Sequence, residues 1–230
     1  MAPANTGGSG LHWLADRRAD LGAVGWQGNR GTCLSFATTA GHDHTRSLTL
    51  SVEYLHWACH TQPLGAGKIA SLVTALKNHG QPEDGQWPYD PACDEVADYA
   101  PPPEAVGPFY TADVALIASD AATVASHVQR GVLPIIGLRV SDAFYRSTGV
   151  VDDDDPGTDG HAVLAVGAAT VTEDVPTAGM SAGDLLVLVR NSWGVEWGVQ
   201  GHALLTPRTW EAVVLLALTV TPGGVPATKS

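Results

Sequence analysis

The hydrophobic pattern of this 230-residue chain changes along its length. In the first half, apolar residues recur at helical three-to-four spacing, as in Val52, Leu55 and Cys59. In the second half, continuous apolar runs typical of buried strands occur at 133–138, 162–168, 184–190 and 213–220. Helices followed by strands predict an α+β fold with two lobes, and ligand sites commonly form where such lobes meet.

Local signals set the bounds of the predicted helices. Thr32 is a helix-capping residue type, so a helix is expected to begin at Cys33 and to stop at Gly41. Further helices are predicted over 51–59, from Ile69 to Gly80, and over 121–130.

The proline-rich segment 90–108 resists regular structure and predicts a strap between two lobes. A boundary near residue 105 divides the chain into a mainly helical lobe over 11–105 and a mainly β lobe over 106–220. Residues 1–10 are small and are predicted to form a disordered leader, and residues 221–230 a flexible tail.

The charge of the chain excludes one class of partner. Its 12 Lys and Arg residues and 24 Asp and Glu residues give a net charge of -12, and such a surface repels nucleic acid. The longest apolar runs are shorter than the roughly 20 residues needed to cross a bilayer, so no membrane partner is expected. The first ten residues lack the pattern of a secretory signal, which leaves a cytoplasmic location or delivery and secretion by another route.

Three segments stand out by their residue types and by their order. The first reads QGNRGTCLSF from Gln27, the second GHAVLAVG from Gly160, and the third RNSWGVEWG from Arg190. Together they resemble the papain family of cysteine peptidases, in which a glutamine lies six residues before the nucleophilic cysteine, a His-Ala stretch follows, and Asn-Ser-Trp-Gly-x-x-Trp-Gly comes last. The resemblance extends over roughly residues 11–215.

The resemblance implies a two-lobed fold with a helical left lobe, an antiparallel β-barrel-like right lobe and the active-site cleft between them. It makes Cys33 the nucleophile, His161 the base and Asn191 the group that orients the imidazole. It also makes Trp193 the cover that excludes water from the His–Asn hydrogen bond, and Gln27 a donor to the oxyanion together with the Cys33 backbone N–H.

Each of these residue types suits its implied role. A thiol attacks as the thiolate, which the N-terminus of a helix stabilises. An imidazole takes the thiol proton and later protonates the leaving amine, while an amide oxygen fixes its tautomer. Losing one oxyanion donor typically costs on the order of 100-fold in rate. The sequence therefore predicts a cysteine endopeptidase that acts through a thioester intermediate on a peptide or protein substrate, with no cofactor.

The substrate groove is predicted from the same resemblance and from the apolar strands. Its candidate residues are Gly65, Ala66, Gly67, Ile136, Gly137, Ala162 and Trp193. Core packing is the alternative interpretation of the strand residues, since it gives the same pattern. The acidic run over 152–155 predicts a solvated loop, with a groove rim that favours basic substrate residues as the alternative.

The chain departs from the family pattern at several positions. Leu34 replaces the usual aromatic residue, and Arg30 stands where the family usually carries a disulfide cysteine. Cys59 and Cys93 fall where another family disulfide is common, and both a bridge and two separate thiols remain open. Because no inhibitory pro-segment precedes Gln27, activity is expected to be limited by trimming of a precursor, by compartment or delivery, or by a separate inhibitor protein.

Four histidines lie close together in the sequence: His42, His44, His56 and His60. They lack the Cys/His spacing of a metal site, so we expect helix-surface and loop positions and no bound metal.

Other functions fit the same catalytic residues. An acyl transferase or deamidase would use the same thioester, because either water or an amine can resolve it. A binding module would keep the fold without turnover, although the intact residue set argues against it. A toxin or effector protease delivered into another cell is a further hypothesis, based on the acidic surface and the missing pro-segment.

Overall fold

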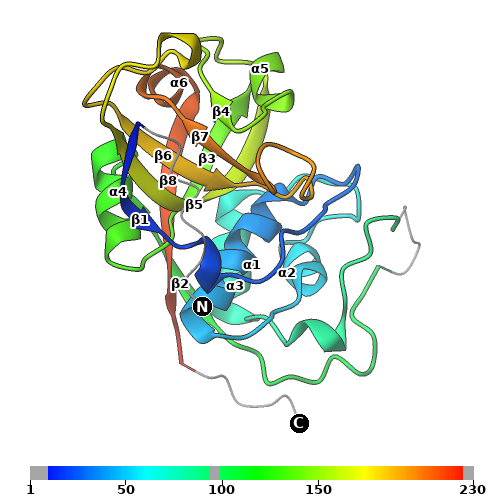
Figure 1. Cartoon of the computed structure of the whole chain (residues 1–230). Helices are drawn as coiled ribbons and strands as arrows, with labels where there is room; N and C mark the ends of the chain where they lie inside the picture. Colours follow the sequence, from blue (N-terminus) through cyan, green and yellow to red (C-terminus); the bar gives the residue numbers. More distant parts are fainter. Residues whose placement is uncertain (1–9, 94–98, 225–230) are drawn as a thin grey trace.

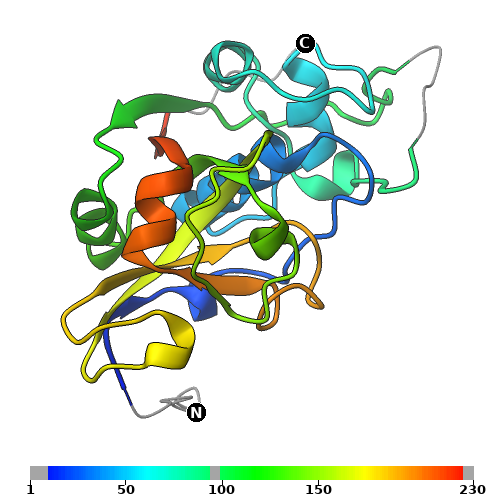
Figure 2. The same cartoon turned by 90° about the horizontal axis from the view of Figure 1, so that it is seen from above.

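The structure is a computed structural model that describes residues 10–93 and 99–224. The helices α1 to α3 gather on one side of a large sheet, as Figure 1 shows. Seen from above, the blue to cyan helical segments and the yellow to red strands again form two groups (Figure 2). The predicted α+β class and two-lobed arrangement are therefore confirmed.

The helices follow the sequence signals closely, with two additions late in the chain. They are α1 (Cys33–Arg46), α2 (Val52–Ala58), α3 (Ile69–Asn78), α4 (Ala121–Gln129), α5 (Asp142–Tyr145) and α6 (Pro207–Val213), with short 3-10 turns at Arg18–Asp20, Asp84–Gln86 and Pro176–Ala178. None of the helices in the described residues is long and apolar enough to span a membrane.

Helix α1 runs past its predicted end at Gly41. Gly41 lies inside the helix and is buried, and a Cβ atom there would make only ordinary contact with the Leu164 side chain, at 3.4 Å. The chain leaves the helix only at Ser47, with φ 53°. Helix α2 begins as predicted, since the Ser51 hydroxyl accepts from the Tyr54 N–H at 3.0 Å.

The strands form one eight-stranded sheet in the order β2-β8-β3-β5-β6-β7-β4, with β1 also paired to β5. They are β1 (Leu11–Asp16), β2 (Ala112–Ile117), β3 (Ile135–Val140), β4 (Val150–Val151), β5 (Asp159–Val171), β6 (Leu185–Arg190), β7 (His202–Leu205) and β8 (Val214–Pro222). All pairs are antiparallel except β4 with β7. The end strands β2 and β4 do not pair, so the sheet is open and the predicted barrel-like closure does not occur.

Strand β5 lies at the centre of the sheet and pairs with β1, β3 and β6. Its first residues pair with β3, placing His161 opposite Leu138, and its later residues pair with both β6 and β1. Strand β1 pairs Leu11 with Val171, so the start of the region assigned to the helical lobe lies in the sheet. Its alternating half-buried pattern fits a strand with one face on the core.

The two groups of elements share one hydrophobic core. Helix α1 packs on β5, β8 and β3, while α4 packs on β5, β6 and β1. The proline-rich strap carries neither helix nor strand in its described parts, 90–93 and 99–108. The predicted leader, apart from Gly10, the end of the predicted tail and the middle of the strap (94–98) lie outside the described residues.

Candidate active site

The start of helix α1 presents Cys33 at the meeting of helices and sheet. Thr32 is the N-cap residue, but its side chain does not cap the helix, and its hydroxyl instead bonds to the Tyr89 hydroxyl at 2.8 Å. The backbone N–H groups of the first turn therefore keep the capacity to interact with an anion. The backbone of Ala162, the residue after His161, acts on the Cys33 thiol and lowers its pKa.

His161 and Asn191 come from neighbouring strands and are joined directly. His161 lies near the start of β5, Asn191 follows the end of β6, and Nε2 of the imidazole is 2.8 Å from Oδ1 of the amide. Both are buried. Because the amide oxygen only accepts, Nε2 carries the proton and Nδ1 is left as the acceptor on the ring.

Aromatic rings enclose this imidazole. The Trp193 ring lies 4.6 Å from the His161 ring, and Phe144 and Trp197 both pack edge-on against Trp193. Tyr145 stacks on Trp193 at 5.0 Å with an interplanar angle of 1°. The sequence identified Trp193 alone; Phe144 and Tyr145 lie on the four-residue helix α5, which is too short to give a periodic signal.

Burial shifts the pKa values of Cys33 and His161 in opposite directions. Desolvation raises the pKa of the thiol, against hydrogen bonds with the backbone of Ala162, Leu34 and Cys33 itself. Desolvation lowers the pKa of His161 to about 4, against the hydrogen bond with Asn191. Each shift alone favours the neutral group, so a thiolate–imidazolium pair here requires the mutual attraction of the two charges.

Gln27 is buried beside the same residues and is fixed at both ends of its amide. Its Nε2 donates to the Arg30 carbonyl at 2.7 Å, and its Oε1 accepts from the Ser192 hydroxyl at 2.6 Å. Its backbone N–H also donates to the Ser192 carbonyl at 2.8 Å. Gln27 is thereby tied both to the segment before Cys33 and to the segment after Asn191.

The Gly65–Gly67 segment lies against the start of α1, as the groove prediction requires. A Cβ atom at Gly31 would stand 2.7 Å from the Gly65 carbonyl oxygen, and one at Gly67 would stand 3.4 Å from the Leu34 side chain. The two backbones are therefore in direct contact. Ala66 is exposed on this segment.

The strand residues of the predicted groove have different environments. Ile136 has an exposed fraction of 0%, so it packs in the core and we no longer include it in the groove. Gly137 pairs with Ala162 across β3 and β5. Ala162 is buried and borders a partly open pocket of about 180 Å³ with Asn191 and Ser192.

The acidic run over 152–155 is a held loop rather than a freely solvated one. Arg208 of α6 pairs with Asp154 at 2.8 Å and with Asp152 at 3.8 Å, and the Thr206 hydroxyl donates to Asp152 at 2.9 Å. Arg208 lowers the pKa of the Asp154 carboxyl. Part of the negative charge of the loop is thus neutralised within the protein.

Two of the four clustered histidines are buried, contrary to the surface positions expected. His42 and His56 have exposed fractions of 0%; His42 bonds to Gln81 at 2.9 Å and His56 to the Gln62 carbonyl at 3.0 Å. Within 10–93 and 99–224, no three His, Cys, Asp or Glu side chains gather as a metal site would require.

Cys59 and Cys93 are not joined by a disulfide. Cys59 is buried in the core beside α2, and burial raises its pKa to about 12. Its thiol is therefore neutral and shielded, unlike that of a reactive cysteine.

The profile of the papain family cysteine proteases matches residues 11–213, nearly the whole described chain. The chain belongs to this family. No curated protein sequence matches this papain-family protease. Solved structures do match it, and the three described next share 19–21% sequence identity with it.

Three of these structures align with most of this papain-family protease. The Amb a 11 cysteine protease of ragweed pollen, in its proform, has a TM-score of 0.72 at 19% identity over 91% of this chain and 66% of its own. A Carica candamarcensis cysteine protease in complex with E-64 has a TM-score of 0.67 at 20% identity over 90% and 96%. Procathepsin L 3 from Tenebrio molitor larval midgut has a TM-score of 0.65 at 21% identity over 88% and 68%. These likenesses concern the fold.

Proposed function

We propose that the protein is a cysteine endopeptidase in which Cys33 attacks the peptide carbonyl and His161 carries the proton. The observation that carries this proposal is the 2.8 Å bond between His161 Nε2 and Asn191 Oδ1. It commits Nε2 to donating, which leaves Nδ1 as the only ring atom able to accept the thiol proton. The effect of the Ala162 backbone on the pKa of Cys33 supports the proximity of Cys33 to the start of β5, where His161 lies.

In the first half-reaction, the proton of the Cys33 thiol passes to His161 Nδ1 as the sulfur bonds to the carbonyl carbon. The carbonyl oxygen becomes an oxyanion, which the Cys33 backbone N–H and the free N–H of the Gln27 amide stabilise. Collapse of this intermediate breaks the C–N bond, and the imidazolium protonates the leaving amine. The product is a thioester on Cys33 and a free amino terminus.

In the second half-reaction, water replaces the leaving peptide. His161 Nδ1 takes a proton from the water as its oxygen attacks the thioester carbon, and the C–S bond then breaks to release a carboxylic acid. Trp193 covers the ring of His161, which keeps bulk water away from the bond to Asn191. Gly65, Ala66, Gly67, Gly137 and Ala162 are the proposed contacts for the substrate backbone, with Trp193 on the leaving-group side.

A peptide-library cleavage profile of the wild type beside Cys33→Ala tests this proposal. Cleavage at internal bonds by the wild type and none by the variant is the expected result. The same samples are scored for deamidation and for transfer to an added amine, because a thioester serves those reactions equally well. Acyl transfer or deamidation without peptide cleavage would overturn the endopeptidase assignment. The role of a delivered effector stays a prediction.

A further inference from the structure

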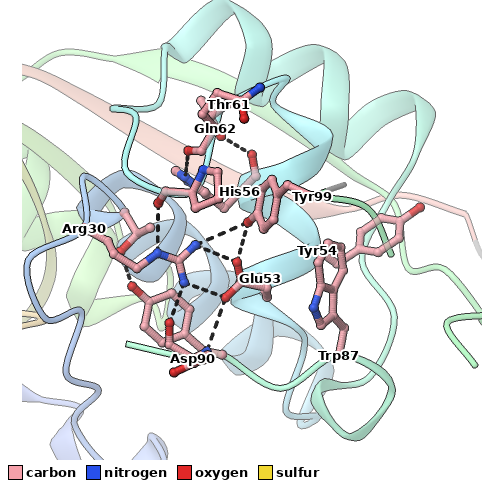
Figure 3. A network of polar contacts seen from close by, with 12 residues as sticks. Arg30, Glu53, Tyr54, His56, Thr61, Gln62, Trp87, Asp90 and Tyr99 are labelled. Atoms are coloured by element: carbon pink, nitrogen blue, oxygen red, sulfur yellow. Dashed lines mark hydrogen bonds and ion pairs between the residues drawn. The ribbon is translucent and has the colours of Figure 1, made fainter. Parts of the chain in front are cut away.

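A buried ionic cluster forms around Arg30, in the segment that leads into α1, and Figure 3 shows it from close by. At its centre, the guanidinium of Arg30 forms two bonds to the Glu53 carboxylate, of 2.7 and 2.6 Å, from different nitrogens. The two side chains have exposed fractions of 1% and 2%. Burial alone would lower the pKa of Arg30, but the hydrogen bond and charge of Glu53 hold it above its ordinary value.

The remaining donors of Arg30 reach two other parts of the chain. Nε donates to the Pro63 carbonyl at 2.8 Å, and one terminal nitrogen donates to the Asp90 carbonyl at 2.7 Å. Tyr99 adds a hydroxyl that bonds to Glu53 and lies 3.3 Å from the guanidinium (Figure 3). The Arg30 side chain thus joins α2, the loop before Gly65 and, through Asp90 and Tyr99, both described parts of the strap.

The backbone of Arg30 has a separate role, since its carbonyl accepts from Nε2 of Gln27. The other end of that amide meets the Ser192 hydroxyl, which could donate or accept and so does not distinguish the two amide orientations. A carbonyl can only accept. The Arg30 carbonyl therefore decides that the Gln27 nitrogen, and not its oxygen, faces Arg30 and the segment that leads to Cys33.

We propose that Arg30 is a positioning residue, whose side chain, clamped to Glu53, Pro63 and Asp90, holds its own carbonyl where it orients the Gln27 amide for oxyanion stabilisation. The inference rests on the proposed function, because it takes Gln27 as the oxyanion donor. A guanidinium suits this task since its planar fork fixes several acceptors at once, which an ammonium does not.

The test uses four forms of the full chain: wild type, Arg30→Met/Glu53→Leu, Gln27→Ala and the triple variant. The double replacement removes both charges together. This variant is expected to fold, because a buried ion pair exchanged for apolar residues of similar size commonly retains the fold. Arg30→Lys is added as the conservative variant, and Arg18→Met, which breaks an exposed ion pair with Asp16, as the control. Thermal melts establish that each form is folded.

The readout is hydrolysis of a p-nitrophenyl ester, which forms the same oxyanion and requires no knowledge of peptide preference. We expect kcat to fall about 100-fold in Arg30→Met/Glu53→Leu, with partial recovery in Arg30→Lys and no change in Arg18→Met. In the Gln27→Ala background the same double replacement should cost less than about 3-fold, because residues that act as a unit are not additive. Alkylation of Cys33 by iodoacetamide, which forms no oxyanion, should change by less than about 3-fold.

A folded Arg30→Met/Glu53→Leu variant with wild-type kcat would overturn the proposal. So would a loss that adds in full to that of Gln27→Ala, since Arg30 would then act by another route. Ester hydrolysis by a wild type that cleaves no peptide would instead overturn the endopeptidase assignment and leave the positioning role supported. A wild type inactive toward both substrates would overturn both.

Discussion

The helical and β sides of the active site are held in place by different interactions. On the helical side, a few directional bonds from the buried Arg30–Glu53 pair fix the segment before Cys33. On the β side, antiparallel pairing and packed aromatic rings fix His161 and its neighbours. Loss of one ionic partner leaves a buried charge, whereas loss of one ring leaves a cavity. The helical and β sides of the site should therefore differ in how they respond to substitution.

The largest effect is expected from removing the proposed reacting group of the helical side or that of the β side. Cys33→Ala and His161→Ala should each reduce kcat for peptide cleavage by about 10⁵-fold or more, and the double variant should be no worse, because the two groups act together. Steady-state assays with one cleaved library peptide measure this. Cys59→Ala, which removes a buried thiol outside the site, serves as the control and should retain activity. Residual turnover in Cys33→Ala well above that level would contradict the assignment of the nucleophile.

Single and double substitutions sharpen the contrast in stability. Arg30→Met should lower the free energy of unfolding by about 3–5 kcal/mol, because it leaves the Glu53 carboxylate buried and unpaired. Adding Glu53→Leu should restore most of that loss. Urea denaturation measures both. Equal losses in the single and double variants would show that charge is not what makes the helical side sensitive.

The aromatic side should respond in the opposite way to a second substitution. Phe144→Ala should cost about 3–5 kcal/mol, since a fully buried ring is removed from between Trp193 and Trp197. Adding Trp197→Ala should deepen the loss, because the second deletion enlarges the cavity. The same urea series measures it. Recovery of stability in the double variant would refute the distinction between the two sides.

The aromatic cover also sets the proton affinity of the base. Burial lowers the pKa of His161 to about 4, so Trp193→Ala should raise that pKa toward the ordinary value of about 6.5 by admitting water. NMR titration of the imidazole in a Cys33→Ala background measures the change without the thiol. Because the folded pKa is below the unfolded one, the Cys33→Ala protein should lose stability as pH falls from about 6.5 to 4. An unchanged His161 pKa in Trp193→Ala would show that the ring does not exclude water.

The smallest expected effect concerns a carboxylate on the helical side that has no ion pair within the described chain. Burial raises the pKa of Asp43 to about 7, with the charge of Asp84 adding to the shift. The unfolded chain releases this proton near pH 4, so the folded state loses stability between about pH 4 and 7 as pH rises. Asp43→Asn keeps the acceptor for the Leu50 N–H and should be about 1–2 kcal/mol more stable than the wild type at pH 8, with no gain at pH 4. A gain in stability that is the same at pH 4 and pH 8 would show that packing, and not the buried charge, is its cause.

The sequence predicted the elements that have strong periodicity or clear end signals. Helices α1 to α4 and strands β3, β5, β6 and β8 were all located, because each combines an apolar pattern with a cap, a glycine or a turn. The four-residue strand β7 and helix α5 were missed because so few residues give no measurable period. Gly41 was misread as a helix end because a glycine can also lie inside a helix, and the chain leaves α1 only at Ser47.

The motifs gave the proposed reacting groups but not the residues that hold them in place. Gln27, Cys33, His161 and Asn191 were identified as candidates because their order along the chain is distinctive. The partner of Arg30 could not be read from the sequence, since Arg30 lies in the loop before α1, Glu53 lies on α2, and only the fold brings the two charges together. The burial of His42 and His56 was missed for the same reason: one ring nitrogen of each bonds to a distant or backbone acceptor that no local pattern reveals.

The two ends of the long central strand β5 lie far apart, one at the candidate active site and the other beside the first strand. His161 lies near one end, and Val171, which pairs with Leu11 of the first strand, lies at the other. Ten residues at about 3.3 Å each place roughly 30 Å between them. A fluorescent protein or an immobilisation tag joined ahead of Leu11 would therefore attach well away from the scissile bond, and the tagged enzyme should accept large substrates without steric interference.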